Sequence, residues 1–303
     1  MTRARRLTRP PRRTPATRTA AADLHVHTTH SDGSCSPAEV VRAAAAVGLT
    51  ALAITDHDTL SALPLARPEA IRLGVELIAG IELTAEHEGR EVHILGHFLD
   101  EDEPALVATT RAMRLARSER LRAMVARLEE LGLQLDLIKL ERAFPRATLG
   151  RRHLADYLAR TGQVADRFEA FRKYLGDDGP AQVPKPRLPI DEAISLIQAA
   201  GGVAGLAHPR FNLHESTLRA YVDLGLGSIE VAGPGINPRL GERWRAWADR
   251  LGLIPIAGSD FHAPDRPGRW LGAITTKGEE LERLRAAAGC ASILDLTPDF
   301  QNP

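Results

Sequence analysis

The stretch D-L-H-V-H-T-T-H-S-D, at residues 23–32, contains the pattern that decides the fold. It begins in a strand predicted over Ala22–His27, in which His25 and His27 stand two positions apart. Side chains at positions i and i+2 of a strand project from the same face, so both imidazoles can bind one metal ion. Asp32 follows after a turn and can complete the same group of ligands. The stretch therefore predicts a metal site at the end of a strand.

Five further clusters have the same chemical character, and most of them directly follow an apolar run that is typical of a buried strand. They are T-D-H-D at 55–58, G-I-E at 80–82, E-V-H-I-L-G at 91–96, A-H-P at 207–209 and G-S-D-F-H at 258–262. The last two lie far along the chain from the first, so local structure does not explain the recurrence, whereas one shared site does. The predicted metal ligands are His25, His27, Asp32, His57, Glu82, His93, His208, Asp260 and His262.

This ligand set predicts a particular class of metal centre. Histidine and carboxylate ligands, with no cysteine required, suit zinc, manganese or iron. Nine ligands are too many for one ion but suffice for two or three that share a bridging group, a role that suits Glu82. Closely spaced ions lower the pKa of a bridging water and neutralise charge on the attacking and leaving oxygens of a phosphate ester. The pattern therefore favours hydrolysis of phosphate esters.

The remaining acids and histidines near these clusters receive separate expectations. Asp56 and Asp58 flank His57 and are expected to hold its ring in one tautomer. His97 is equally compatible with an ordinary strand histidine and with a role in the site. Three other histidines are expected at the surface: His30, His87 and His214.

The order of predicted elements indicates an α/β protein. A helix near 69–73 separates the strands at 49–54 and 76–84, and a polar turn joins the latter to a strand at 91–99. The strand–helix alternation returns after residue 186, with a last strand predicted over Ser292–Leu296. Repeated βα units favour a parallel sheet, and ligands at successive strand ends favour closure into a barrel of about seven units. Residues 101–185 have helical spacing almost throughout and predict an inserted helical segment.

Composition limits the class of protein. The two cysteines, Cys35 and Cys290, argue against a disulfide framework and fit a reduced, cytoplasmic setting. Apolar runs fall short of the roughly 20 residues that span a membrane, and the start lacks the apolar core of a signal peptide. We therefore expect a cytoplasmic protein without a membrane segment.

Charge is distributed unevenly along the chain. Residues 1–20 hold seven of the 39 basic residues and none of the 39 acidic ones, so the rest has a balance of −7. This Arg- and Pro-rich segment is predicted to be a disordered tail, either a simple solvated extension or an arm that binds nucleic acid. The negative balance of the remainder opposes binding of a long polyanion but not of a short substrate that meets dications.

Taken together, these motifs resemble the PHP (polymerase and histidinol phosphatase) family of metal-dependent phosphoesterases, over about residues 22–296. The resemblance implies a distorted (β/α)7 barrel over 21–100 and 186–303, with 101–185 as a cap over the substrate. It implies two or three divalent ions, most often manganese, with zinc or iron as alternatives, and a metal-bound hydroxide as the nucleophile. It also implies a small phosphorylated substrate and no obligate protein partner.

Two elements of the insertion extend the resemblance to one subgroup. Gly150-Arg151-Arg152-His153 and Phe171–Leu175 are similar to the G-R-x-H and K-Y-L elements of bacterial 3′,5′-nucleoside bisphosphate phosphatases and of a related 5′→3′ exoribonuclease acting on short RNAs. The subgroup therefore implies a nucleotide or short RNA as substrate. Its candidate phosphate contacts here are Arg151, His153 and Lys173.

Two departures from the subgroup affect the expected substrate contacts. Gln182 stands where a tyrosine is common, which removes a ring for stacking on a base. Arg210 stands where glycine is frequent and adds a candidate phosphate contact. Two other functions stay open: a phosphatase for another small phosphate such as histidinol phosphate, and a metal- or nucleic-acid-binding protein that has lost catalysis. The presence of all nine predicted ligands argues against the latter.

Overall fold

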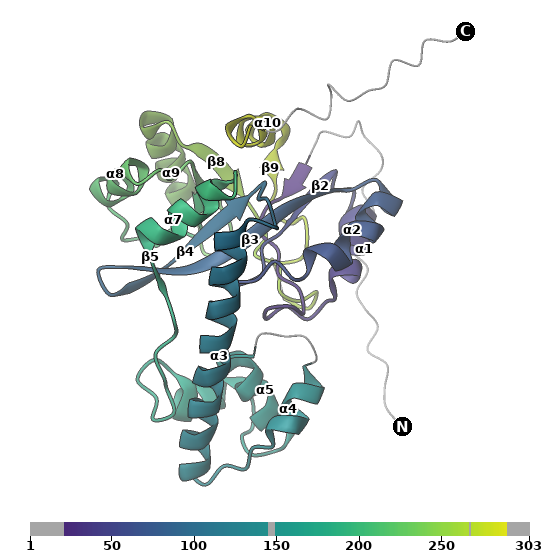
Figure 1. The fold of residues 1–303 in the computed structure, drawn as a ribbon, viewed down its shortest axis with the longest axis vertical. Coiled ribbons are helices and arrows are strands. Elements are labelled where there is room, and N and C mark those ends of the chain that lie inside the picture. Colours follow the sequence, from purple (N-terminus) through teal and green to yellow (C-terminus); the bar gives the residue numbers. More distant parts are fainter. Residues whose placement is uncertain (1–20, 145–148, 267, 290–303) are drawn as a thin grey trace.

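The structure is a computed structural model that describes residues 21–144, 149–266 and 268–289 (Figure 1). The Arg-rich segment 1–20 and the strand predicted at 292–296 lie outside these ranges.

The strands form one mixed sheet in the order β8-β7-β6-β4-β3-β2-β1-β9, with β5 beside β3. Most neighbours are parallel, but β4 runs antiparallel to both β3 and β6, and β9 antiparallel to β1. The bounds are β1 (Ala21–Asp23), β2 (Ala51–Ile54), β3 (Glu76–His87), β4 (Arg90–His97), β5 (Leu188–Pro189), β6 (Val203–Leu206), β7 (Ser228–Ala232), β8 (Ile254–Ala257) and β9 (Thr276–Lys277).

The two ends of the sheet approach each other. Val26, just beyond β1, forms a parallel bridge with Phe261, just beyond β8. The backbone N–H of His27 donates to the carbonyl of Phe261 at 2.9 Å. The expected distorted barrel is therefore present, nearly closed at the carboxyl ends of its parallel strands.

The helices cover the barrel and build the insertion. Their bounds are α1 (Pro37–Val47), α2 (Leu63–Leu73), α3 (Pro104–Glu130), α4 (Leu137–Ala143), α5 (Arg151–Arg160), α6 (Arg167–Ala170), the π-helix η1 (Phe171–Leu175), α7 (Ile190–Ala199), α8 (Glu215–Asp223), α9 (Pro238–Leu251) and α10 (Gly278–Ala287). One result differs from the sequence pattern: α2 begins six residues earlier than the predicted 69–73. This helix is short, and at this length packing outweighs local periodicity.

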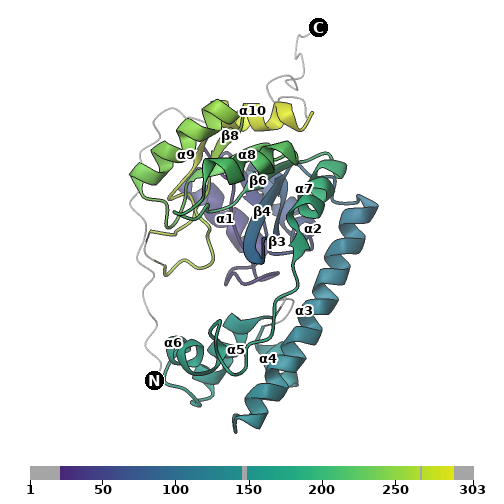
Figure 2. The same ribbon diagram turned by 90° about the vertical axis from the view of Figure 1, so that its left-hand side faces the viewer.

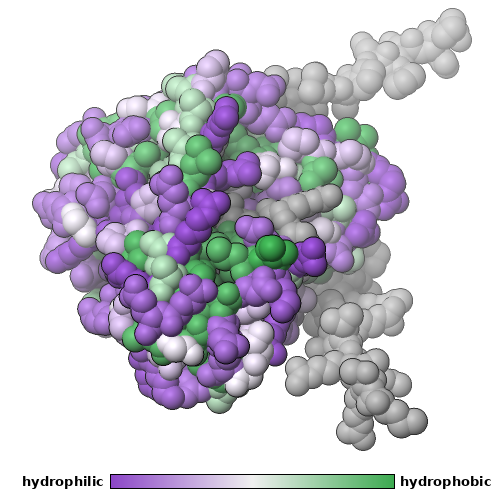
Figure 3. Space-filling view, turned by 60° about the horizontal axis from the view of Figure 1, so that its bottom comes forward, coloured by the Kyte–Doolittle hydropathy of each residue, from purple (hydrophilic) through white to green (hydrophobic). Residues whose placement is uncertain are grey.

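Helix α3 belongs to both parts of the molecule (Figure 2). Leu106 and Met113, in its first half, are buried in the barrel core, whereas Met124 and Leu128 are buried in a separate core within the insertion. The rest of the insertion packs against the second half of this helix and lies below the strand ends in Figure 1. Its outer face is mostly hydrophilic, interrupted by smaller hydrophobic areas (Figure 3).

Candidate metal centre

Glu82, near the middle of β3, stands at the centre of the predicted site and is almost fully buried. Five imidazoles surround its carboxylate. Oε1 lies 2.7 Å from His93 Nδ1 and 2.9 Å from His208 Nε2, and Oε2 lies 3.1 Å from His57 Nδ1, 3.2 Å from His27 Nε2 and 3.3 Å from His25 Nε2. Histidines from four segments of the chain therefore converge on one carboxylate.

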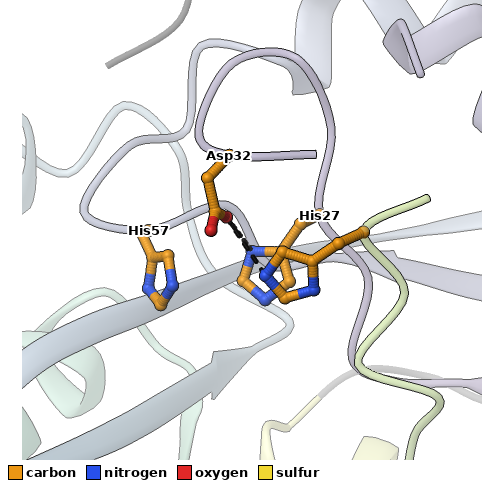
Figure 4. A group of neighbouring side chains, drawn as sticks. His27, Asp32 and His57 are labelled. Carbon is orange, nitrogen blue, oxygen red and sulfur yellow. Dashed lines mark ion pairs between the residues drawn. The ribbon is translucent and has the colours of Figure 1, made fainter. Parts of the chain in front are cut away.

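The other candidate ligands extend this cluster on one side. His262 Nε2 lies 3.1 Å from Asp32 Oδ1, and its Nδ1 lies 3.3 Å from Asp260 Oδ1. The ring of His262 stacks on that of His27 with centroids 4.3 Å apart. Figure 4 shows His27 and Asp32, from the segment after β1, and His57, from the segment after β2, facing a common space. The structure thus brings all nine sequence-predicted ligands together.

The donor atoms fit divalent metal ions. Four groups have ligand atoms within 4.8 Å of one another: His27, Asp32, His57 and His262; His25, His27 and Asp260; His25, Glu82 and His208; and His57, Glu82 and His93. Within the described residues, Asp32 Oδ1, His57 Nδ1 and Glu82 Oε2 are buried without a hydrogen-bond partner. Buried polar atoms normally have one, so a cation that accepts these lone pairs accounts for the arrangement. Of the three acids in these four groups, Glu82 is the one that belongs to two groups, as a bridging carboxylate requires.

The charges in this cluster support the same conclusion. Burial lowers the pKa of His25, but the neighbouring carboxylates of Glu230 and Glu82 outweigh it and raise that pKa well above its usual value. Burial raises the pKa of Glu82, but His57, His93 and His25 hold it well below its usual range. Imidazoles and carboxylates thus stabilise each other's charged forms, and a bound dication would displace the protons.

The backbone is strained at two of the candidate ligands, each of which follows the end of a strand. His208, after β6, has φ 28°, and Asp260, after β8, has φ 46°. Such angles are unfavourable for residues with a Cβ and persist where the surroundings impose them, often at functional sites. Between β8 and Asp260, Gly258 passes so close to His25 that an added Cβ would lie 2.4 Å from the His25 Cβ. This close approach sets the position of the Asp260 loop against the first strand.

Glu230 is a site residue that the sequence pattern missed. It is buried in β7, with Oε1 3.0 Å from Nδ1 of His25, and its other oxygen accepts the backbone N–H of His208. It therefore orients two candidate ligands, by contacting Nδ1 of His25 and the backbone N–H of His208, as carboxylates commonly do for metal-bound histidines. The sequence feature that could have indicated Glu230 is a single acid inside the mostly apolar strand S-I-E-V-A.

A second supporting contact comes from Glu91 in β4. Its Oε1 lies 2.9 Å from His93 Nε2 and 3.1 Å from Lys185 Nζ. His93 therefore has a carboxylate at each ring nitrogen, Glu91 on one side and Glu82 on the other. Lys185 lies in the chain that returns from the insertion, so this segment touches the ligand set through Glu91.

The prediction for the acids beside His57 was wrong. Asp56 accepts hydrogen bonds from Thr28, at 2.7 Å from the backbone N–H and 2.6 Å from the hydroxyl. Asp58 accepts from the Thr84 N–H at 2.7 Å and pairs with Arg117 of α3. Both carboxylates point away from His57 because neighbours on a turn face different directions. They brace the loops that carry the ligands instead.

The burial of the remaining histidines agrees only in part with the expectation. His97 is fully buried, and its Nε2–H donates to the carbonyl of Leu24 at 2.8 Å, a structural role. His30 was expected at the surface, but it is 6% exposed and its Nδ1 lies 2.7 Å from the Ser61 hydroxyl. The turn after the first strand folds inward, which buries it. His214 is exposed, as expected, and His87 is half-buried.

Within the described residues, the predicted substrate contacts of the insertion make no hydrogen bond or ion pair with the candidate ligands. Arg151 pairs with Asp177 at 2.7 Å, exposed Lys173 pairs with Glu169 at 2.6 Å, and buried His153 accepts the Gly150 N–H at 3.1 Å. Arg152 reaches the centre instead, with Nη1 3.3 Å from Asp32 Oδ2. Successive residues of a helix point about 100° apart, so only one of the two arginines faces the barrel.

A pocket of about 260 Å³ adjoins the candidate metal centre. His93 and His208 form its inner wall, and Arg210, the fourth predicted substrate contact, also lines it. The tip of the β3–β4 hairpin, the loop after β6 and helix α8 supply the rest.

Comparison with known proteins identifies the family. The model of the PHP domain matches residues 23–168. A 5′-3′ exoribonuclease of Haemophilus influenzae is 36% identical over 80% of this chain and 90% of its own length. A 3′,5′-nucleoside bisphosphate phosphatase of Chromobacterium violaceum is 36% identical over 84% of this chain and 91% of its own length. This chain belongs to the PHP domain family.

Solved structures agree with this assignment to the PHP family. A Bifidobacterium adolescentis protein, proposed to be a metal-dependent phosphoesterase, superposes with a TM-score of 0.82 at 30% identity and covers 90% of this chain and 98% of its own. A Chromobacterium violaceum amidohydrolase with bound sulfate gives a TM-score of 0.78 at 34% identity, covering 88% and 97%. The resemblance seen in the motifs and the PHP-type barrel are both confirmed. None of the helices in the described ranges is long and apolar enough to cross a membrane.

Proposed function

We propose that this PHP protein is a metal-dependent phosphoesterase that hydrolyses a terminal phosphate of a nucleotide or short RNA. The convergence of six histidines and two aspartates around Glu82 carries the proposal, because four overlapping ligand groups suit more than one ion. The named activities of the relatives, a bisphosphate phosphatase and an exoribonuclease, support the substrate class.

The centre is proposed to hold two or three divalent ions, with manganese the first choice and zinc or iron the alternatives. When bound, such ions supply hydroxide at neutral pH and neutralise charge on the reacting phosphate. The protein contributes the geometry: Glu82 lies between two ligand groups, and Glu230 fixes His25 while positioning His208.

The insertion, residues 101–185, is proposed to cover the site and bind the part of the substrate that does not react. Arg152 already extends from it to Asp32. Arg151 remains the proposed phosphate clamp, because its partner Asp177 is 88% exposed and a surface ion pair of this kind is weak enough for a substrate phosphate to replace. His153 is buried and is proposed to hold the turn before α5.

The test is to measure bound metals and then phosphate release with added manganese. The panel contains adenosine 3′,5′-bisphosphate, histidinol phosphate and a short 5′-phosphorylated RNA. We expect two or three metal ions per chain and fastest turnover of the bisphosphate or the RNA. Preference for histidinol phosphate would replace the nucleotide assignment with the alternative phosphatase. Full metal occupancy without turnover of any phosphate ester would indicate a catalytically silent protein.

A further inference from the structure

The insertion is joined to the barrel by two segments of the chain, and each brings a cation to an acid beside a candidate ligand. Helix α3 leads into the insertion (Figure 2). It carries Arg117, which is 9% exposed and pairs with Asp58, the residue after His57. The return chain, residues 180–187, carries Lys185, whose Nζ lies 3.1 Å from Oε1 of Glu91 in β4. These two ion pairs, called the junction below, hold the insertion to the barrel at its entry and at its exit.

The entry pair fixes the turn that carries His57. Asp58 has φ 52°, an angle that persists in a residue with a Cβ where the surroundings impose it. Its N–H donates to the carbonyl of Glu82 at 3.0 Å, and its carboxylate accepts the Thr84 N–H at 2.7 Å and the Thr84 hydroxyl at 3.0 Å. Arg117 donates to the same carboxylate and, at 3.0 Å, to the Thr84 hydroxyl. The turn, and with it His57, is therefore held against β3 by a side chain of α3.

The exit pair fixes the carboxylate that contacts His93. Oε1 of Glu91 lies 3.1 Å from Lys185 Nζ and 2.9 Å from His93 Nε2, and Oε2 lies 3.3 Å from Nε of Arg187. The side chain of Lys185 is only 17% exposed, so solvent screens this pair less than it screens a pair on the open surface. Two cations of the return chain therefore set the position of the acid that orients His93.

The entry and exit segments are also tied to each other. Nε of Arg120, in α3, donates to the carbonyl of Val183 at 2.7 Å, and Arg127 donates to the carbonyl of Gln182. Val183 stands two residues before Lys185 in the return chain. A movement of α3 against the barrel would therefore disturb both ion pairs of the junction together.

Both ion pairs bear on one group of candidate ligands. Of the four groups within the described residues, the group that contains both His57 and His93 is the one completed by Glu82. Thr84, which accepts a hydrogen bond from Arg117, is also the sheet partner of His93 in the β3–β4 register. The insertion thus supports two of the three ligands of this group, each from a different end.

We propose that the junction couples the insertion to the metal centre, so that seating of the insertion and loading of the ion at His57, Glu82 and His93 favour each other. Arg117 and Lys185 act as positioning residues, because each acts on a candidate ligand through an acid. The inference rests on the proposed function, since it takes the centre to bind divalent ions.

The physical basis is the same in both directions. The paired acids hold the two histidine rings where an ion can bind them. An ion that fixes the rings keeps Asp58 and Glu91 where the cations of the insertion can pair with them. Such coupling is reciprocal: the factor by which seating strengthens ion binding equals the factor by which the ion strengthens seating. A residue that only stabilised the fold would not show this second effect.

The first measurement is calorimetric titration of the metal-free full chain with manganese. Lys185→Met removes the exit cation and Arg117→Met the entry cation. The matched controls are Lys139→Met, at an exposed lysine of α4, and Arg114→Met, at an exposed arginine of α3. We expect the junction variants to bind one manganese ion about 10- to 100-fold more weakly, the usual effect of losing a residue that orients a ligand. The other ions should bind as in wild type, and Lys185→Arg, which keeps the charge, should restore most of the affinity.

The second measurement is hydrogen exchange of the backbone, with and without manganese. In wild type, manganese should slow exchange in peptides covering 111–124 and 181–187 by about 5-fold or more beyond its effect on α9, the lower end of common coupling factors. Helix α9 packs on β7 and β8 and reports any general stabilisation by the metal. In Lys185→Met this extra protection should disappear, whereas in Lys139→Met it should remain.

Unchanged manganese binding in Lys185→Met would overturn the inference, and this variant decides the matter if Arg117→Met does not fold. Equal weakening of every ion would also overturn it, because the loss would then not belong to one ligand group. The same holds if manganese protects the junction peptides no more than α9. In these three cases wild-type protein still binds manganese, and the proposed function stands. Wild-type protein that takes up no manganese would count against the proposed function and this inference together.

Discussion

Glu82 Oε1 lies 2.7 Å from Nδ1 of His93, although the two residues are not partners in the sheet. In the β3–β4 hairpin, Glu82 pairs with Leu95 and His93 pairs with Thr84, so the contact is diagonal across the antiparallel register. Side chains at this diagonal spacing share a face and can meet. A slip of one residue would turn His93 to the opposite face, so the hairpin register is a condition for the site.

Replacing Glu82 by Gln should empty the centre while preserving the barrel. The amide removes the negative charge that two ligand groups share, so the amount of bound manganese per chain should fall. Hydrolysis should fall by more than about 100-fold, which exceeds the effect of losing a residue that only orients a metal ligand. Metal analysis after gel filtration, with circular dichroism for the fold, measures both. Glu86→Gln is the matched control, because Glu86 is an exposed acid on the same strand. Full metal occupancy in Glu82→Gln would contradict the central role of this carboxylate.

Glu230→Gln should weaken metal binding without abolishing it. The carbonyl oxygen of the introduced amide can still accept the His208 N–H, but the neutral amide cannot stabilise charge on His25 as the carboxylate does. We expect roughly 10- to 100-fold weaker manganese affinity, with activity restored by excess metal. Manganese titration followed by calorimetry measures this. An activity loss that excess manganese does not restore would show that Glu230 acts in some other way.

Arg151→Ala should affect a bisphosphate more than a simple aryl phosphate. Only the bisphosphate has a second phosphate for a guanidinium to hold, and one charge-assisted contact contributes roughly 1.5–3 kcal/mol, or about 10–150-fold in kcat/KM. Arg152→Ala is the companion variant, because Arg152 touches Asp32 and should affect both substrates alike. Small, equal effects of Arg151→Ala on the two substrates would remove it from the phosphate contacts.

The stability of the metal-free protein should carry a pH dependence from His97. Burial lowers the pKa of His97 to about 4, from its usual 6.5. Its contribution to stability is therefore complete above pH 6.5 and is lost as pH falls through 4, because the unfolded chain binds the proton first. Between pH 7 and 5 the loss should be roughly 2 kcal/mol.

Urea unfolding of wild type and His97→Gln at both pH values measures this loss. Glutamine does not titrate, so the variant should lose less free energy of unfolding between pH 7 and 5. The other titrating groups are common to both proteins and cancel in the comparison. Equal losses in the two proteins would show that His97 does not titrate in this range.

Local sequence pattern was sufficient to predict the nine candidate ligands that gather at the site. His25 and His27 project together because strand side chains alternate, and clusters such as Asp260 and His262 follow strands whose carboxyl ends meet at one face. Both properties depend on spacing along the chain, which a sequence displays directly. His93 was predicted as well, although β4 runs antiparallel to β3, because the hairpin brings the first half of β4 to the same face.

Tertiary structure alone decided the contacts between these segments. Glu230 reaches His25, 205 residues away along the chain, because closure of the barrel brings β8, with β7 beside it, next to the end of β1. Arg152 rather than Arg151 reaches Asp32, because the direction of each side chain depends on how α5 is rotated against the barrel. Side-chain alternation and strand ends are set by backbone geometry within a few residues, whereas partners at long range depend on how whole elements pack. The sequence therefore determined the candidate ligand set, and the packing of the barrel and the insertion determined what surrounds it.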